Sequence, residues 1–236
     1  EISACLVGSE MCIRDRCYGD SNTWGYISGS DHQRYGNEER WTKLLAQLLG
    51  DRFEVIEEGL NSRTLISNDM RPGKEGKNGY DYLIPCLDTH DPVDLVILML
   101  GTNELKSVYQ KTAEEIGKIL EEHFVKTILN RKSQTKDSYP KLLLVVPPIV
   151  NEHTEYCKTN NKYLGATQKS KELNEIYKRI ADKYHCYFLG NDGLIPGIDG
   201  VHLTKESHLK LSRLLELKIR AVSYTHLRAH ETGRNL

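Results

Sequence analysis

Four short polar segments, spread over the whole chain, carry residue types that can do nucleophilic chemistry. In chain order they are residues 19–25 (GDSNTWG), 58–64 (EGLNSRT), 101–104 (GTNE) and 199–204 (DGVHLT). Each segment alone is ordinary turn or helix-capping chemistry, because Gly, Asp, Asn, Ser and Thr favour such positions. Together they supply a nucleophile, a base, a residue that orients the base, and donors for an oxyanion, which are the parts that ester cleavage requires.

Ser21 and His202 are the predicted nucleophile and general base. A serine hydroxyl is a weak nucleophile until a base removes its proton, and an imidazole with an ordinary pKa of about 6.5 is mostly neutral at pH 7. Asp199 lies three residues before His202, so its carboxylate can reach the Nδ1–H of the imidazole and fix the tautomer. The spacing therefore predicts a catalytic triad of Ser21, Asp199 and His202.

An oxyanion needs fixed hydrogen-bond donors about 2.7–3.1 Å away. The backbone N–H groups of Ser21 and Gly59 and the side-chain amide of Asn103 are the candidates. Neighbouring residues of the same segments are candidates for supporting the site or lining a substrate pocket: Asp20, Asn22, Trp24, Asn61, Ser62, Arg63 and Val201. We expect the aromatic rings of Trp24, Tyr26 and residues 80–85 to pack in the core rather than to line the entrance.

Strand and helix patterns alternate around these segments. Apolar runs predict strands at residues 53–56, 94–100, 142–146 and 186–189, with a further strand before Gly19. Helical periodicity and capping residues predict helices at residues 38–49, from Thr112 to about Ile128, at 169–184 and after Thr204. This alternation predicts an α/β protein, a three-layer α/β/α sandwich around a mostly parallel five-stranded sheet, with functional residues beyond the carboxyl ends of the strands.

The four segments, in this order, resemble the SGNH hydrolase (GDSL esterase) family, whose name records residues found here as Ser21, Gly59, Asn103 and His202. The resemblance covers nearly all of residues 17–220. It is stronger to the arylesterase and acyltransferase branch, through CYGDSNTWGY, RWTKLLAQLLG, FEVIEEGLNSRT, DLVILMLGTNE and DGVHLT. It implies a flavodoxin-like SGNH fold, an acyl-enzyme mechanism that needs no metal or other cofactor, and a homo-oligomer that narrows the active-site entrance.

Three departures from the family pattern stand out. Glu104 occupies a position where the family usually has Asp, and Asn61–Ser62 replaces small residues of close relatives, so we expect a more polar or narrower pocket mouth. Residues 13–16 (IRDR) stand where the family has an apolar strand. Because unpaired buried charge is costly, we expect this first strand to be imperfectly buried or to destabilise the protein.

The two ends of the sequence differ in character from its middle. Residues 1–16 lack strand alternation and helical periodicity, and residues 222–236 lose the apolar stripe of the helix before them. Both resemble peptides translated from sequencing-adapter DNA. We therefore expect residues 1–16 to be a non-native segment, residues 17–220 to be one SGNH hydrolase domain, and residues 221–236 to be a non-native tail.

Composition and charge limit the classes of binding partner that the chain is expected to have. Basic and acidic residues nearly cancel, 32 against 33, with an isoelectric point near 6.8, which gives no support for a nucleic-acid or anionic-membrane partner. The sequence has no run of about 18 apolar residues, which is the pattern of a membrane-spanning helix. The six cysteines form no C-x-x-C pair, so the sequence has no zinc-ribbon motif, and their sparse spacing favours a reducing, cytoplasmic compartment.

The predicted function is a serine carboxylesterase that cleaves small, acetyl-type acyl esters, with a small-molecule ester as its expected substrate. The resemblance adds acyl transfer or perhydrolysis as further activities. A carbohydrate O-acetylesterase is the first alternative, because the same fold hosts the same chemistry on sugars. A non-catalytic, flavodoxin-like binding module is the second, although the sequence has neither of the usual glycine-rich phosphate loops.

Overall fold

The computed structural model describes residues 13–232, with side chains described for residues 13–159 and 161–221. A five-stranded sheet in the order β2-β1-β3-β4-β5 forms the centre, and every neighbouring pair is parallel. The strands are β1 (Ile13–Gly19), β2 (Phe53–Gly59), β3 (Leu95–Met99), β4 (Lys141–Val145) and β5 (Tyr187–Leu189). The sheet confirms the predicted α/β class.

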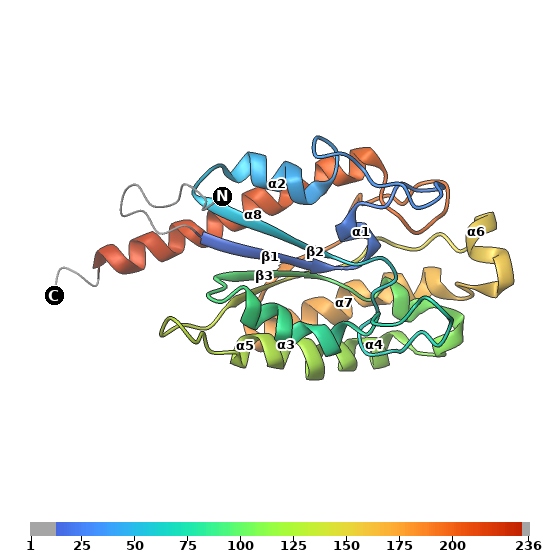
Figure 1. The fold of residues 1–236 in the computed structure, drawn as a ribbon, viewed down its shortest axis with the longest axis horizontal. Coiled ribbons are helices and arrows are strands. Elements are labelled where there is room, and N and C mark those ends of the chain that lie inside the picture. Colours follow the sequence, from blue (N-terminus) through green and yellow to red (C-terminus); the bar gives the residue numbers. More distant parts are fainter. Residues whose placement is uncertain (1–12, 233–236) are drawn as a thin grey trace.

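Helices cover both faces of the sheet (Figure 1). One face carries α2 (Trp41–Leu49) and α8 (Lys205–Thr232), and the other carries α3 (Gly79–Thr89), α4 (Ala113–Ile119), α5 (Lys126–Asn130) and α7 (Ala166–Tyr184). Shorter elements complete the described chain: α1 (Ser21–Trp24), α6 (Glu155–Lys158), the 3₁₀ turns Thr102–Leu105, Ser107–Tyr109 and Thr159–Asn161, and a π segment Leu120–Val125. This is the predicted three-layer sandwich.

The apolar run of β3 explains the two cores. Ile97 and Met99 point to the core under α2 and α8, whereas Val96 and Leu98 belong to the core on the opposite face. Side chains alternate between the faces of a strand, so a strand covered on both sides must be apolar throughout. All five residues of β3 are buried.

The register of the sheet brings the four polar segments to one edge. Gly19 of β1 pairs with Gly59 of β2 on one side and with Met99 of β3 on the other. The residues that follow each strand therefore leave the sheet at the same level. In Figure 1, α1 and α6 lie beyond this carboxyl edge.

Helix boundaries differ from the predicted ones where local signals conflict. Helix α3 was not predicted, because Gly79 and Pro85 counter its pattern; the Asn78 side chain caps it by accepting from the Tyr80 N–H at 3.1 Å. Helix α2 begins at Trp41 rather than Glu38. The predicted capping box at Thr112 is present, but the helix that it opens widens into the π segment before α5.

β1 begins at Ile13, inside the segment predicted to be foreign, and α8 continues beyond residue 220. Ile13 and Arg14 are half-buried, whereas the rest of β1 is buried, with Asp15 and Arg16 0% and 2% exposed. The charged segment is therefore buried more completely than expected, and the alternative expectation, that it destabilises the protein, stays a prediction. The foreign origin of residues 1–16 and 221–236 stays a prediction, and residues 1–12 and 233–236 lie outside the described residues. Within residues 13–232, no helix has the length and apolar character to cross a bilayer.

Candidate active site

Ser21 lies at the start of α1, immediately after the turn that ends β1. Asp20 caps this helix, because its Oδ1 accepts a hydrogen bond from the Asn22 N–H at 2.9 Å. Gly19 is required by the close packing of the turn, since a Cβ there would lie 2.8 Å from the Met99 carbonyl oxygen. The turn holds the Ser21 side chain at the edge of the sheet, 6% exposed.

His202 contacts Ser21 with one ring nitrogen and Asp199 with the other. Its Nε2 lies 2.9 Å from the Ser21 Oγ, and its Nδ1 lies 2.6 Å from the Asp199 Oδ2. A carboxylate accepts hydrogen bonds only, so the proton of the neutral ring resides on Nδ1. The Nε2 lone pair then faces the serine hydroxyl. This geometry brings together the three predicted triad residues, which the sequence separates by up to 181 positions.

Asp199 is held as a carboxylate by four donors. Its Oδ1 accepts from the backbone N–H groups of Val201 and His202, both at 2.9 Å, and its Oδ2 accepts from the Gly29 N–H at 3.1 Å as well as from the imidazole. Burial alone would raise the pKa of Asp199, but the hydrogen bonds from His202 and the backbone outweigh it and hold that pKa well below its ordinary value.

Asn22 ties the serine turn to the histidine segment. Its Oδ1 accepts from the Leu203 N–H at 2.9 Å, and its Nδ2 donates to the Val201 carbonyl at 3.3 Å. The Trp41 indole in turn donates to the Asn22 carbonyl at 3.0 Å. The predicted supporting residues Asn22 and Val201 therefore act on the site through the position of the backbone.

Gly59 ends β2 and Asn103 follows β3, both at the edge of the sheet that carries Ser21. A Cβ on Gly59 would come within 2.3 Å of the Trp24 backbone nitrogen, so only glycine allows β2 to approach α1 this closely. The Asn103 Nδ2 donates to the Arg63 carbonyl at 3.0 Å. An amide nitrogen carries two hydrogens, so the second one can donate to a substrate oxygen.

Arg63 binds the backbone at the carboxyl ends of β1 and β2. It is 3% exposed, and its Nη1 donates to the Gly19 carbonyl at 2.9 Å and also to the Glu58 carbonyl. Its guanidinium lies 4.2 Å from the centroid of the Tyr18 ring, a cation–π contact. One side chain thereby fixes the ends of both β1 and β2.

Glu104, the residue that departs from the family pattern, is fully buried and binds the backbone. Its Oε1 accepts from the N–H groups of Leu65, Ile66 and Ser67 at 2.9, 3.0 and 3.3 Å. The longer side chain reaches these three donors and fastens the segment after Arg63 to the end of β3.

A cavity of about 290 Å³ opens beside the triad, and its lining is Tyr26, Gly29, Ser30, Tyr156, Ile198 and Asp199. The Tyr26 ring stacks on the His202 imidazole, with centroids 4.3 Å apart. Tyr26 was expected to pack in the core and instead lines this cavity. Sequence reasoning missed four lining residues that lie outside the polar segments, Ile198 by a single position: Gly29, Ser30, Tyr156 and Ile198. Trp24, Asn61 and Ser62 do not line this cavity, and the Trp24 ring packs against Tyr26 and beneath the Arg34 guanidinium.

The parallel sheet and the serine–histidine–aspartate geometry at its edge are those of an α/β serine hydrolase. The chain belongs to the GDSL-like lipase/acylhydrolase family, whose model matches residues 17–209. It is an ester hydrolase of the SGNH type.

Two solved structures illustrate the likeness. A carbohydrate acetylesterase from Sinorhizobium meliloti is 36% identical with a TM-score of 0.81, and the match covers 89% of this chain and 99% of that one. The native aryl esterase of M. smegmatis is 35% identical with a TM-score of 0.80, with the same coverage. No curated protein matches the chain significantly.

Proposed function

We propose that Ser21, His202 and Asp199 cleave esters through an acyl-enzyme. The Ser21 Oγ attacks the ester carbonyl carbon while its proton passes to the His202 Nε2, and the Asp199 carboxylate stabilises the resulting imidazolium. Collapse of the tetrahedral intermediate expels the alcohol, which takes the proton from His202. Water then repeats the sequence on the acyl-enzyme and releases the carboxylic acid. The observation that carries this proposal is the pair of short contacts at the two nitrogens of His202.

The oxyanion formed in each step would accept hydrogen bonds from the Ser21 and Gly59 N–H groups and from the Asn103 amide. Preorganised donors of this kind commonly supply the largest part of catalysis. The packing of Gly59 against Trp24 and the contacts of Arg63 support this role, because they leave these groups little freedom to reorganise.

We propose a small acyl group, of acetyl type, as the substrate class. A cavity of about 290 Å³ lies just below the usual range of ligand sites, roughly 300–1,000 Å³. An acyl-enzyme that is open to water can also pass its acyl group to an alcohol or to peroxide. Homo-oligomerisation is a further proposal, which the 81% exposed Ile198 at the cavity supports. We also propose a cytoplasmic location, which the four free cysteines of the described residues support.

The second candidate function is a carbohydrate O-acetylesterase. The name of the similar Sinorhizobium meliloti structure favours it, and so does the pair of tyrosines in the cavity lining, because aromatic rings offer flat apolar faces to a sugar. The chemistry at Ser21 would be unchanged, and only the alcohol part of the ester would differ. The filled triad argues against the non-catalytic binding module.

An acyl-length series decides between these functions. Aryl esters from acetate to octanoate should show kcat/KM falling steeply with chain length, and acetate release from acetylated xylan measures the carbohydrate activity. Ser21→Ala should lower kcat by about 10⁶ without changing the melting temperature. Ser138→Ala, in the loop before β4 and outside the site, is the matched control. Full activity in Ser21→Ala would refute the mechanism, and a preference for xylan would establish the second function.

A further inference from the structure

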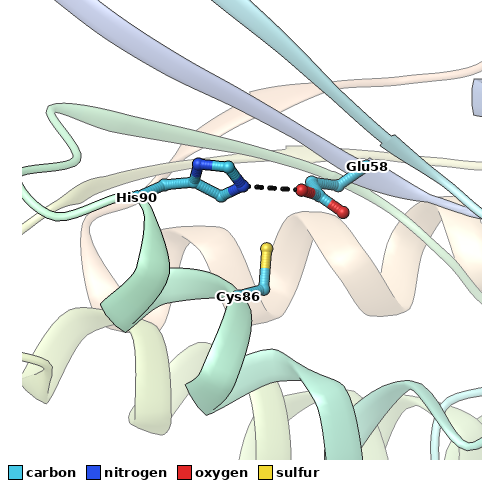
Figure 2. A group of neighbouring side chains, drawn as sticks. All are labelled: Glu58, Cys86 and His90. Carbon is cyan, nitrogen blue, oxygen red and sulfur yellow. Dashed lines mark hydrogen bonds and ion pairs between the residues drawn. The ribbon is translucent and has the colours of Figure 1, made fainter.

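Glu58, Cys86 and His90 form a cluster that the ester chemistry does not use. Glu58 lies at the end of β2, one residue before Gly59, and Cys86 and His90 lie near the carboxyl end of α3. The last two are four residues apart, so they share one face of the helix. Figure 2 shows both side chains turned toward the Glu58 carboxylate.

The three side chains offer one sulfur, one nitrogen and one oxygen ligand to a common point. Their ligand atoms lie within 4.8 Å of one another, and the His90 Nε2 is 2.8 Å from the Glu58 Oε1. Cys86 is buried, whereas the side chains of Glu58 and His90 keep 15% and 25% exposure. A cation could therefore reach the cluster from solvent.

We propose that Glu58, Cys86 and His90 bind a zinc-class divalent cation. Sulfur, imidazole and carboxylate ligands at close quarters are the donor set that zinc selects, and three protein ligands leave a fourth tetrahedral position for water. The alkaline-earth cations prefer oxygen ligands alone. The bound cation would fasten the end of α3 to the end of β2, next to Gly59.

A bound cation would change the electrostatic environment of the Cys86 sulfur from unfavourable to favourable for a thiolate. Burial, and then the charge of the neighbouring Glu58, raise the pKa of the Cys86 thiol to about 12, so the thiol keeps its proton without a cation. A divalent cation between the sulfur and the carboxylate replaces their repulsion by attraction. Binding then releases the thiol proton to solvent, and His90 presents its Nε2 lone pair with its own proton on Nδ1.

Two arginines complete the surroundings. The Arg16 Nη2 donates to the His90 carbonyl at 3.1 Å and thereby holds the end of α3 in place. Arg63 and Arg16 both lie near enough to Cys86 to oppose the increase in its pKa. Cysteinate, Glu58 and a divalent cation together are neutral, so the loaded cluster adds no net charge beside these guanidinium groups.

Cobalt(II) tests the proposal directly, because a thiolate bound to it gives a charge-transfer absorption in the near ultraviolet. The full chain should develop this absorption on titration with Co²⁺ and lose it when Zn²⁺ displaces the cobalt. Cys86→Ala and His90→Gln should abolish or strongly weaken it. Cys186→Ala, the half-buried free cysteine outside the cluster, and the double variant Cys5→Ala/Cys12→Ala, whose residues lie outside the described residues, should retain it.

Thermal unfolding gives a second measurement that needs no esterase activity. Zn²⁺ at a hundredfold excess over its Kd should raise the melting temperature of the original chain by about 5–10 °C, and that of Cys86→Ala by much less. Ser21→Ala should bind the metal as the original chain does, so a failure of the hydrolase mechanism leaves this test intact. Absence of the absorption, or its persistence in Cys86→Ala, would overturn the proposal.

Discussion

The two ends of β1 bury polar groups in opposite ways. At the carboxyl end, Ser21 contacts His202, and nearby Asp199 accepts four hydrogen bonds although it is 4% exposed. At the amino end, Asp15 is fully buried, and neither of its carboxyl oxygens has a hydrogen-bond partner. The same residue type is therefore held as a carboxylate at one place and as an acid at the other.

The pKa values express this difference. Hydrogen bonds lower the pKa of Asp199 against the effect of burial, whereas burial and then the charge of Asp94 raise the pKa of Asp15 to about 8. Burial raises the pKa of both residues, and at Asp199 the hydrogen bonds and the charge of His202 outweigh it. A buried carboxyl group therefore stays charged where neighbouring N–H groups donate hydrogen bonds to it, as they do at Asp199.

Removing the negative charge at the satisfied end should have the largest effect of the three variants that follow. Asp199→Asn should lower kcat by about 10⁴, because the amide lets His202 adopt the tautomer that cannot accept the serine proton. Steady-state hydrolysis of an aryl acetate measures this loss, with Asp192→Asn on the exposed surface as the control. Retention of more than a tenth of the activity would show that the Asp199 contact is structural only.

Removing one donor from the same edge should have a smaller effect. Asn103→Ala should lower kcat by about 10²–10³ with little change in KM, because the lost hydrogen bond forms to the oxyanion rather than to the bound ester. Asn68→Ala, on an exposed loop, is the matched control. An equal loss in both variants, or a change confined to KM, would contradict the assignment of Asn103.

The unsatisfied end should change stability rather than rate. The Asp15 carboxyl keeps its proton in the folded chain up to about pH 8 but loses it near pH 4 when unfolded. The folded state then binds more protons, so the free energy of unfolding falls as pH rises from 4 to 8, by at most about 1.4 kcal/mol per pH unit, and levels off above 8.

Asp15→Asn removes the titrating group and should flatten this dependence, while Asp51→Asn, on an exposed turn, should leave it unchanged. Urea unfolding at pH 5, 6, 7 and 8 gives the slopes. Equal slopes in the original chain and in Asp15→Asn would show that the buried carboxyl is not protonated.

Motif order and apolar patterning were sufficient to predict the sheet, its layers and the meeting of Ser21, His202 and Asp199. The continuous apolar run at residues 94–100 predicts a strand that is buried on both faces. Asp199 and His202 lie in one short segment, so their spacing along the chain sets their contact. The same local reasoning could not find α3, because Gly79 and Pro85 oppose the helix and only its packing against the sheet stabilises it.

The remaining features arise from tertiary contacts between segments without motifs. Tyr156 reaches the cavity from α6, far along the chain from Tyr26, and nothing in its neighbourhood marks it. The cluster of Glu58, Cys86 and His90 was missed for a similar reason, since its carboxylate lies 28 residues before Cys86. The burial of Asp15 and Arg16 in β1 was not expected. Arg14 keeps its head group at the surface with Glu54, and Arg16 donates to the Asp15 and His90 carbonyls, so only part of the charge of this segment is buried without a partner. The expected destabilisation stays a prediction.

The paired bonds of Asn22 to Val201 and Leu203 join the first strand turn to the approach of the last helix. Nucleophile and base therefore belong to opposite ends of the polypeptide, and ribosomal synthesis must deliver nearly the whole domain before either has its partner. No early folding intermediate made from the first half of the chain can possess the site. Catalytic competence is in this sense a property of the finished domain, acquired in its last step of assembly.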